Sequence, residues 1–154
     1  MSSFVLSGQN NYNHCYISFH CAIEDGDEVV LTGGVLGRDF LVTRYNVEGV
    51  ATSLPSLNTG RATHACGKFI TADLETVSLG SWSILLLLTL PAQFYIVSGG
   101  YVGIPGRNLA STEILNKNGG TGWATAASLP FGRRHFTGLS ISNGHFLVAG
   151  GDNM

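Results

Sequence analysis

The sequence has little charge of either sign, and this excludes several kinds of partner. Only 12% of its 154 residues are charged, against roughly 25% in a typical soluble domain. The formal net charge is −2, and the longest basic run is Arg133-Arg134. A nucleic-acid surface needs clustered cations to neutralise phosphates, so no nucleic acid is expected among the partners.

Cysteine is also scarce. The three cysteines, Cys15, Cys21 and Cys66, are odd in number and stand outside any C-x-x-C spacing. This arrangement disfavours both a disulfide framework of the secreted type and a zinc site. We therefore expect a reducing compartment and a cytoplasmic protein.

Long hydrophobic runs are missing. The strongest apolar run, residues 84–90, is far shorter than the ~18 residues that cross a bilayer. Residues 1–20 have no basic start and no continuous apolar stretch, so they do not resemble a secretory signal. No membrane association is expected.

Catalytic motifs are absent too. The sequence contains no G-x-S-x-G elbow, no H-E-x-x-H and no phosphate-binding glycine motif. Three acidic residues crowd one turn and are interpreted as solvated charges: Asp25, Asp27 and Glu28. The sequence therefore predicts no catalytic residue and no cofactor, and a protein that is not an enzyme.

The one cluster with metal-ligand chemistry is the doublet His14-Cys15 and His20-Cys21. Adjacent residues on a strand point to opposite faces, so a His-Cys pair cannot readily aim both side chains at one ion. We expect no metal site here.

What the chain has in abundance is glycine, with 21 residues. Glycine supplies the positive φ angles of tight turns, so many short strands joined by hairpins are predicted. One block occurs three times: a histidine, an apolar strand, a turn, a second apolar strand and a glycine pair. The histidines are His20, His64 and His135, and the pairs are Gly33-Gly34, Gly99-Gly100 and Gly150-Gly151. We expect the histidines to occupy equivalent structural positions, and the glycines to permit close strand packing.

Turn residues support this reading. Asp25-Gly26 and Asn143-Gly144 are the dipeptides of a two-residue type I′ hairpin. Further strands are expected at 40–45 and 111–115, followed by the exits Leu54-Pro55 and Leu129-Pro130. Four strands per unit is the content of one propeller blade.

The repeat spacing is uneven. The glycine pairs begin at residues 33, 99 and 150, so the intervals are 66 and 51 residues. The 17 residues at 77–93 lack strand alternation and account for the excess. They are interpreted as an insertion, either translated intron sequence or a long hairpin loop.

These features together resemble the kelch repeat. The resemblance rests on Val30-Leu31-Thr32-Gly33-Gly34 followed by Arg44-Tyr45-Asn46 and Leu54-Pro55, and on Val97-Ser98-Gly99-Gly100-Tyr101 followed by Thr112-Glu113-Ile114-Leu115, Trp123 and Leu129-Pro130. It covers about residues 20–153. It implies an all-β fold: an incomplete kelch-type β-propeller of four-stranded antiparallel blades. In its light Tyr45 and Trp123 are expected in blade core or inter-blade packing.

The predicted organisation follows from the resemblance. Residues 1–18 form a divergent N-terminal segment, and 19–154 a partial propeller. Its blades are 19–60, 61–130 with the insertion, and a truncated blade at 131–154. Such an arc leaves blade faces uncovered, so self-association through those faces is expected.

The resemblance also implies a function. Kelch propellers commonly bind acidic peptide segments through loop arginines, and Arg107, in the loop 103–108, is the predicted partner-binding residue. Arg61 and Arg134 precede first strands and are expected to serve the blades themselves. The favoured hypothesis is a non-catalytic scaffold or substrate-receptor fragment with a protein partner. The alternatives are a piece of a sugar-active propeller of the galactose-oxidase or sialic-acid mutarotase kind, and a truncated product without independent function.

Overall fold

The structure, a computed structural model, describes residues 19–35, 39–71, 92–103, 106–141 and 145–152. Across these residues every regular element is a β-strand, and every strand pairing is antiparallel. The all-β, antiparallel prediction is therefore confirmed. The same residues form no helix that could cross a membrane.

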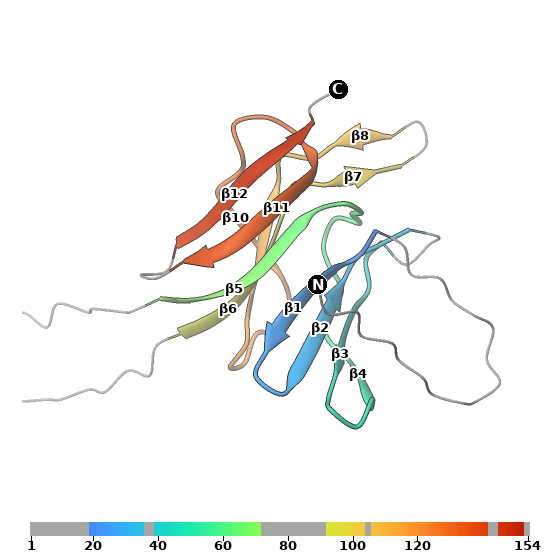
Figure 1. Cartoon of the computed structure of the whole chain (residues 1–154), viewed down its shortest axis with the longest axis vertical. Helices are drawn as coiled ribbons and strands as arrows, with labels where there is room; N and C mark the ends of the chain where they lie inside the picture. Colours follow the sequence, from blue (N-terminus) through green and yellow to red (C-terminus); the bar gives the residue numbers. More distant parts are fainter. Residues whose placement is uncertain (1–18, 36–38, 72–91, 104–105, 142–144, 153–154) are drawn as a thin grey trace, which may run out of the picture.

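Two sheets have four strands each, and in both the strands lie side by side in chain order, apart from a short ribbon in the second (Figure 1). The first sheet contains β1 (Cys21–Asp25), β2 (Glu28–Thr32), β3 (Val42–Tyr45) and β4 (Ala51–Ser53). The second contains β5 (Ala65–Thr71), β6 (Ala92–Ser98), β9 (Thr112–Asn116) and β10 (Ala124–Ala126). Connections between neighbouring strands make each sheet a simple meander.

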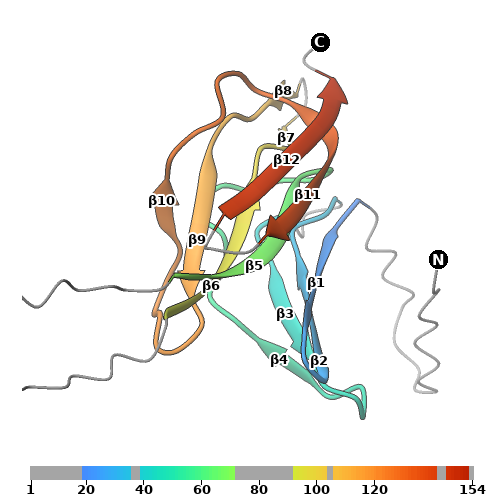
Figure 2. The same ribbon diagram turned by 60° about the vertical axis from the view of Figure 1, so that its left-hand side comes forward.

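Two smaller pairs complete the fold. Between β6 and β9 the chain forms a ribbon of β7 (Tyr101–Val102) and β8 (Arg107–Asn108). The third sheet pairs β11 (Arg134–Ile141) with β12 (His145–Asp152). Figures 1 and 2 show the three sheets as a fan in which β5 lies between β1 and β11.

The hydrophobic core lies between the first two sheets. Alternate residues of facing strands point into it, as a half-buried sheet requires. The buried members are Ile23, Val30, Val42, Leu57, Cys66, Tyr95, Val97, Leu115 and Trp123. Trp123 Nε1 donates to the Pro55 carbonyl at 2.8 Å, so this tryptophan joins the two sheets, whereas Tyr45 is only half-buried. Val50, which precedes β4 as Trp123 precedes β10, is 56% exposed, because no described sheet covers that side.

The interpretation of Asp25 as a solvated charge is wrong. Its side chain is 4% exposed and accepts hydrogen bonds from Lys117 at 2.8 Å, Lys68 at 3.4 Å and the Tyr95 hydroxyl. Burial alone would raise the pKa of Asp25, but the hydrogen bonds of Lys117 and Tyr95 and the two lysine charges outweigh burial and lower it. Lys68 and Tyr95 lie on the second sheet and Lys117 directly follows its strand β9, so the carboxylate joins the two sheets, while Asp27 is exposed.

Glycines set the approach of the third sheet to the second. A Cβ at Gly67 would lie 2.7 Å from the Phe146 ring and from Ser140 Oγ, and one at Gly138 would lie 2.2 Å from the same ring. Side chains at either place would hold β11 and β12 away from β5. The Phe146 ring thus packs directly on the backbone of β5 at Gly67 and of β11 at Gly138.

Three residues with positive φ lie at equivalent places near the starts of β1, β5 and β11. Phe19, Thr63 and His135 have φ of 61°, 53° and 54°. The Thr63 amide donates to the Phe19 carbonyl at 2.9 Å, and the His135 amide to the Thr63 carbonyl at 3.1 Å. His135 therefore matches Phe19 and Thr63, and the expected equivalence with His20 and His64 is wrong by one residue. The residue of the third sheet that matches His20 and His64 is therefore Phe136, which directly follows His135.

The glycine pairs take the same conformation in all three sheets. All six residues have positive φ, between 61° and 124°. The second glycine donates to an arginine carbonyl in the next segment: Gly34 to Arg61 at 2.9 Å and Gly100 to Arg133 at 2.8 Å. A Cβ at Gly33 would lie 2.3 Å from the Arg61 carbonyl oxygen. The first two pairs thus occur where one sheet is hydrogen-bonded to the start of the next.

Local predictions need three corrections. In the first hairpin Asp25 pairs with Glu28, so the central turn residues are Gly26 and Asp27. Only Gly26 has positive φ, 64°, which fits a type II′ turn rather than I′; the Asn143-Gly144 turn lies outside the described residues.

The second and third corrections concern boundaries. The last two residues of the expected insertion, 92 and 93, belong to β6, and 77–91 lie outside the described residues. The two Leu-Pro exits are not equivalent. The Leu129 amide donates to the Ala110 carbonyl, and the matching bond in the first sheet runs from the Leu57 amide to the Phe40 carbonyl. Leu129 therefore corresponds to Leu57 and not to Leu54.

Candidate functional site

Arg61 is fully buried between the first two sheets and is a structural residue. Its guanidinium forms an ion pair with Glu113 and donates to the carbonyls of Gly99 and Ser111, each at 2.9 Å. Glu113 also accepts the amides of Asn58 at 2.8 Å and Thr59 at 3.1 Å. Nearly every polar atom of the pair is therefore satisfied without solvent.

Arg133, and not Arg134, is the counterpart of Arg61 in the third sheet. Its Nη1 donates to the Gly150 carbonyl at 2.9 Å, as Arg61 does to Gly99. Arg134 lies on the first residue of β11 and pairs with Asp152 at 3.0 Å. The prediction that Arg134 serves the blade in the manner of Arg61 is therefore wrong by one position.

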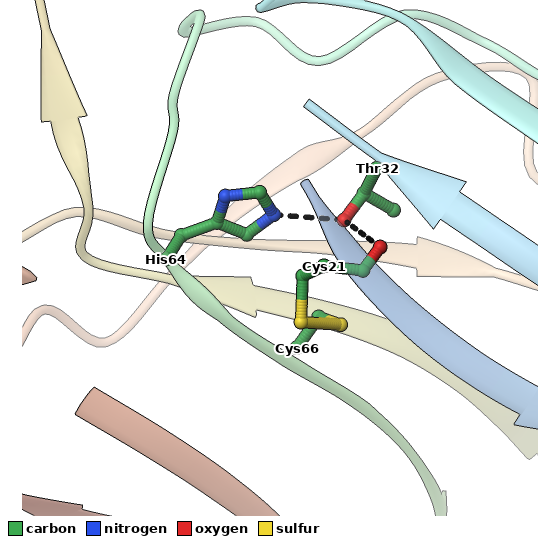
Figure 3. Close-up of a disulfide and its surroundings, with 4 residues drawn as sticks. All are labelled: Cys21, Thr32, His64 and Cys66. Atoms are coloured by element: carbon green, nitrogen blue, oxygen red, sulfur yellow. Dashed lines mark hydrogen bonds between the residues drawn. A yellow bond between two sulfur atoms is a disulfide. The ribbon is translucent and has the colours of Figure 1, made fainter. Parts of the chain in front are cut away.

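His64 and a disulfide lie together where β1 meets β5 (Figure 3). Cys21 and Cys66 form a disulfide with a Cα–Cα distance of 5.9 Å. His64 Nε2 lies 2.8 Å from Thr32 Oγ1, and the Thr32 hydroxyl donates to the Cys21 carbonyl at 3.4 Å. Because the hydroxyl has a single proton, it can donate to only one of these two groups at a time.

The disulfide contradicts the expectation that these cysteines do not form one. It also removes Cys21 from the His-Cys doublet as a thiolate ligand, since its sulfur is bonded to Cys66. His14 and Cys15 lie outside the described residues. The cysteine count misled because an odd total does not prevent two of the three from pairing. Disulfides are rare in reducing compartments, so this bond does not support the compartment that the cysteine count suggested. Cytoplasmic localisation stays a prediction.

Burial of His64 predicts acid sensitivity. Burial, with the charges of Arg61 and His20, lowers the pKa of His64 to about 3, whereas an unfolded histidine has a pKa of about 6.5. Between these values the unfolded chain binds a proton that the folded chain does not. Stability should therefore decline by about 1.4 kcal/mol for each unit that pH falls below about 6.5. Urea unfolding measured at several pH values tests this.

The His64→Phe variant should lose most of that slope, and the phenylalanine at the matching place of the third sheet, Phe136, shows that the position accepts this ring. His145→Gln, at an exposed position of β12, is the matched control and should keep it. An unchanged slope in His64→Phe would show that other groups cause the decline.

The predicted partner-binding residue, Arg107, lies on an exposed surface next to β11. It is exposed on β8, and among the described residues it has no ion-pair partner. The Arg134 guanidinium lies 4.9 Å from the ring centroid of Tyr101, which pairs with Asn108 beside Arg107. We call Tyr101, Arg107, Asn108, Arg134 and Asp152 the arginine surface.

The arginine surface has a rigid aromatic centre. A Cβ at Gly106 would lie 1.9 Å from the Tyr101 ring, so glycine is needed for β8 to lie against that ring. The same ring takes the Arg134 guanidinium in a cation–π contact. The ribbon was expected only as a loop, and two-residue strands are too short to give an alternation pattern in sequence.

Charge on the arginine surface is mainly positive. The one carboxylate among the residues of this surface is Asp152. Hydrogen bonding to His135 lowers the pKa of Asp152, and Arg134 lowers it further, while loss of solvation opposes both. The described residues 101–103, 106–108 and 131–136 contain no acidic side chain. The surface can therefore accept a carboxylate from a partner, through Arg107 above all.

Comparisons with known proteins identify a fold and no family. No family model and no curated protein matches the sequence. The solved structure of YjhT, a propeller-like protein, is similar with a TM-score of 0.62 and 16% sequence identity. The match covers 95% of this chain and 42% of that one, so this chain spans less than half of its length. The chain is thus an all-β protein with propeller-like antiparallel sheets.

Proposed function

We propose that this chain is a non-catalytic protein-interaction module of the kelch type, which binds an acidic peptide segment on the arginine surface. The observation that carries the proposal is the exposed Arg107, which has no ion-pair partner among the described residues and directly follows Gly106, the residue that packs on the Tyr101 ring. Exposed arginines next to rigid aromatic rings are common at protein interfaces. Membership of the kelch family, the blade boundaries and the absence of catalysis belong to this proposal.

A labelled peptide tests the proposal. A twelve-residue peptide rich in Asp and Glu should bind the full chain, and its Asn and Gln analogue should bind much more weakly. Arg107→Gln should weaken binding of the acidic peptide about tenfold, because it removes a charge-assisted hydrogen bond. Fluorescence anisotropy at two salt concentrations measures both affinities and their screening.

The matched control is Arg44→Gln. Arg44 lies on β3 of the first sheet, far from β8 (Figure 1), and pairs loosely with Glu28 at 3.5 Å. Its loss should leave peptide affinity unchanged. Equal affinity for the acidic peptide and its uncharged analogue, or an unaffected Arg107→Gln variant, would refute the proposal.

A further inference from the structure

Arg133 has only part of the hydrogen bonding that its counterpart Arg61 has. Arg61 reaches Glu113 Oε1, Ser111 O and Ser111 Oγ, which all come from the segment that forms β9 next to β6. Arg133 keeps the bond to the glycine pair, at Gly150, but none of the described residues gives it contacts like those that Arg61 makes with Glu113 and Ser111. In the second sheet these partners belong to the segment of the strand beside β6. In the third sheet they would belong to a strand beside β12.

The edge of β12 is built to accept such a strand. Within the described part of the chain, β12 pairs with β11 alone, and it is eight residues long. In the other two sheets, the edges formed by β4 and β10 have three residues each, which limits pairing with other chains. A long edge strand presents a row of backbone donors and acceptors to any extended chain.

The second sheet gives the register of the missing strand. Ala65 pairs with Ser98 ahead of Gly99, as Thr137 pairs with Ala149 ahead of Gly150. Val148 thus takes the place of Val97, which stands opposite Glu113. A glutamate opposite Val148 would face Arg133 as Glu113 faces Arg61.

Neighbouring positions of the added strand have apolar partners. In the second sheet Ile114 stands opposite Ile96 and Leu115 opposite Tyr95. Their counterparts on β12 are Leu147, 52% exposed, and Phe146. Cross-strand apolar pairs at these places would add to the backbone hydrogen bonds.

We propose that the outer edge of β12 is a docking site for an extended peptide strand that carries a glutamate opposite Val148 and apolar residues directly after it. The acid completes the hydrogen bonding of Arg133, and the strand extends the third sheet as β9 extends the second. This site shares the end of β12 with the arginine surface, through Asp152, but it does not depend on Arg107.

The chain's own β9 sequence provides a defined probe. A labelled peptide of residues 109–117, LASTEILNK, is titrated against the full chain, beside the analogue with glutamine at the place of Glu113. The glutamate peptide should bind, and the analogue at least tenfold more weakly, since it loses a hydrogen bond between charged groups. Amide exchange should slow in β12 and remain unchanged in β4 and β10.

Protein variants separate this site from the arginine surface. Arg133→Gln should abolish the preference for the glutamate peptide, whereas Arg107→Gln should keep it. Because the two peptides are compared on the unaltered chain, the test stands even where Arg133→Gln fails to fold. Equal binding of both peptides, no binding, or protection outside β12 would overturn the proposal, and so would a dimer of the chain formed through β12 that excludes the peptide.

Discussion

The Arg61→Met variant is expected to lose about 3–5 kcal/mol of unfolding free energy, because removing one partner of a buried ion pair leaves the other charge uncompensated. The Arg61 and Glu113 side chains are 0% and 3% exposed. Methionine also leaves the Gly99 and Ser111 carbonyls without their guanidinium donor. Urea denaturation followed by tryptophan fluorescence measures the loss, with Trp123 reporting from the same interface.

Arg107→Met is the matched control. The side chain is exposed and unpaired among the described residues, so the same chemical change should alter stability by about 0.5 kcal/mol or less. If Arg61→Met costs no more than Arg107→Met, Arg61 does not hold the first two sheets together.

The second large effect is expected at the disulfide. Cys21 and Cys66 are separated by 45 residues in sequence, and a cross-link over a loop of that length is worth about 4 kcal/mol in the chain-entropy description. Reduction, or the Cys21→Ser variant, should lower stability by that order. Thermal unfolding with and without reductant measures the change.

Cys15→Ser serves as the control for the loss of a thiol. It should leave both stability and the response to reductant as they are in the parent chain. Peptide mapping of the unreduced protein should recover the Cys21–Cys66 link with Cys15 alkylated. Three alkylated thiols in the native protein would contradict the disulfide.

Sequence reasoning succeeded where the information is local. The strands that end in glycine pairs at 33, 99 and 150 were found because apolar alternation and glycine are local signals. Arg107 was singled out by its loop position; it is exposed, and its role in binding a partner stays a prediction. Neither of these needed knowledge of which sheets touch.

It failed where a residue's environment comes from another sheet. Asp25 looked solvated because its turn is polar, yet Lys117, 92 residues later, covers it. Cys21 and Cys66 are brought together by the packing of β1 against β5, which no spacing rule encodes. Partners this distant in the chain are fixed only by the complete fold.

Alignment of the repeats failed by single residues. His135 was matched to His20 and His64 on residue type, but the structural register follows the left-handed residues and their hydrogen bonds. The same one-residue shift led Arg134, in place of Arg133, to be matched to Arg61. One residue matters because successive side chains of a strand point to opposite faces.

The covalent link between the first two sheets has a mechanical consequence. If tension were applied along the chain, β1 and β5 could not separate while the Cys21–Cys66 bond remained intact. Among the described residues, the β11–β12 sheet is held to β5 and the segment before it by packing and hydrogen bonds. Under load the third sheet would therefore detach first, and residues 21–66, which the bond closes into a loop, would carry no tension until the bond was reduced.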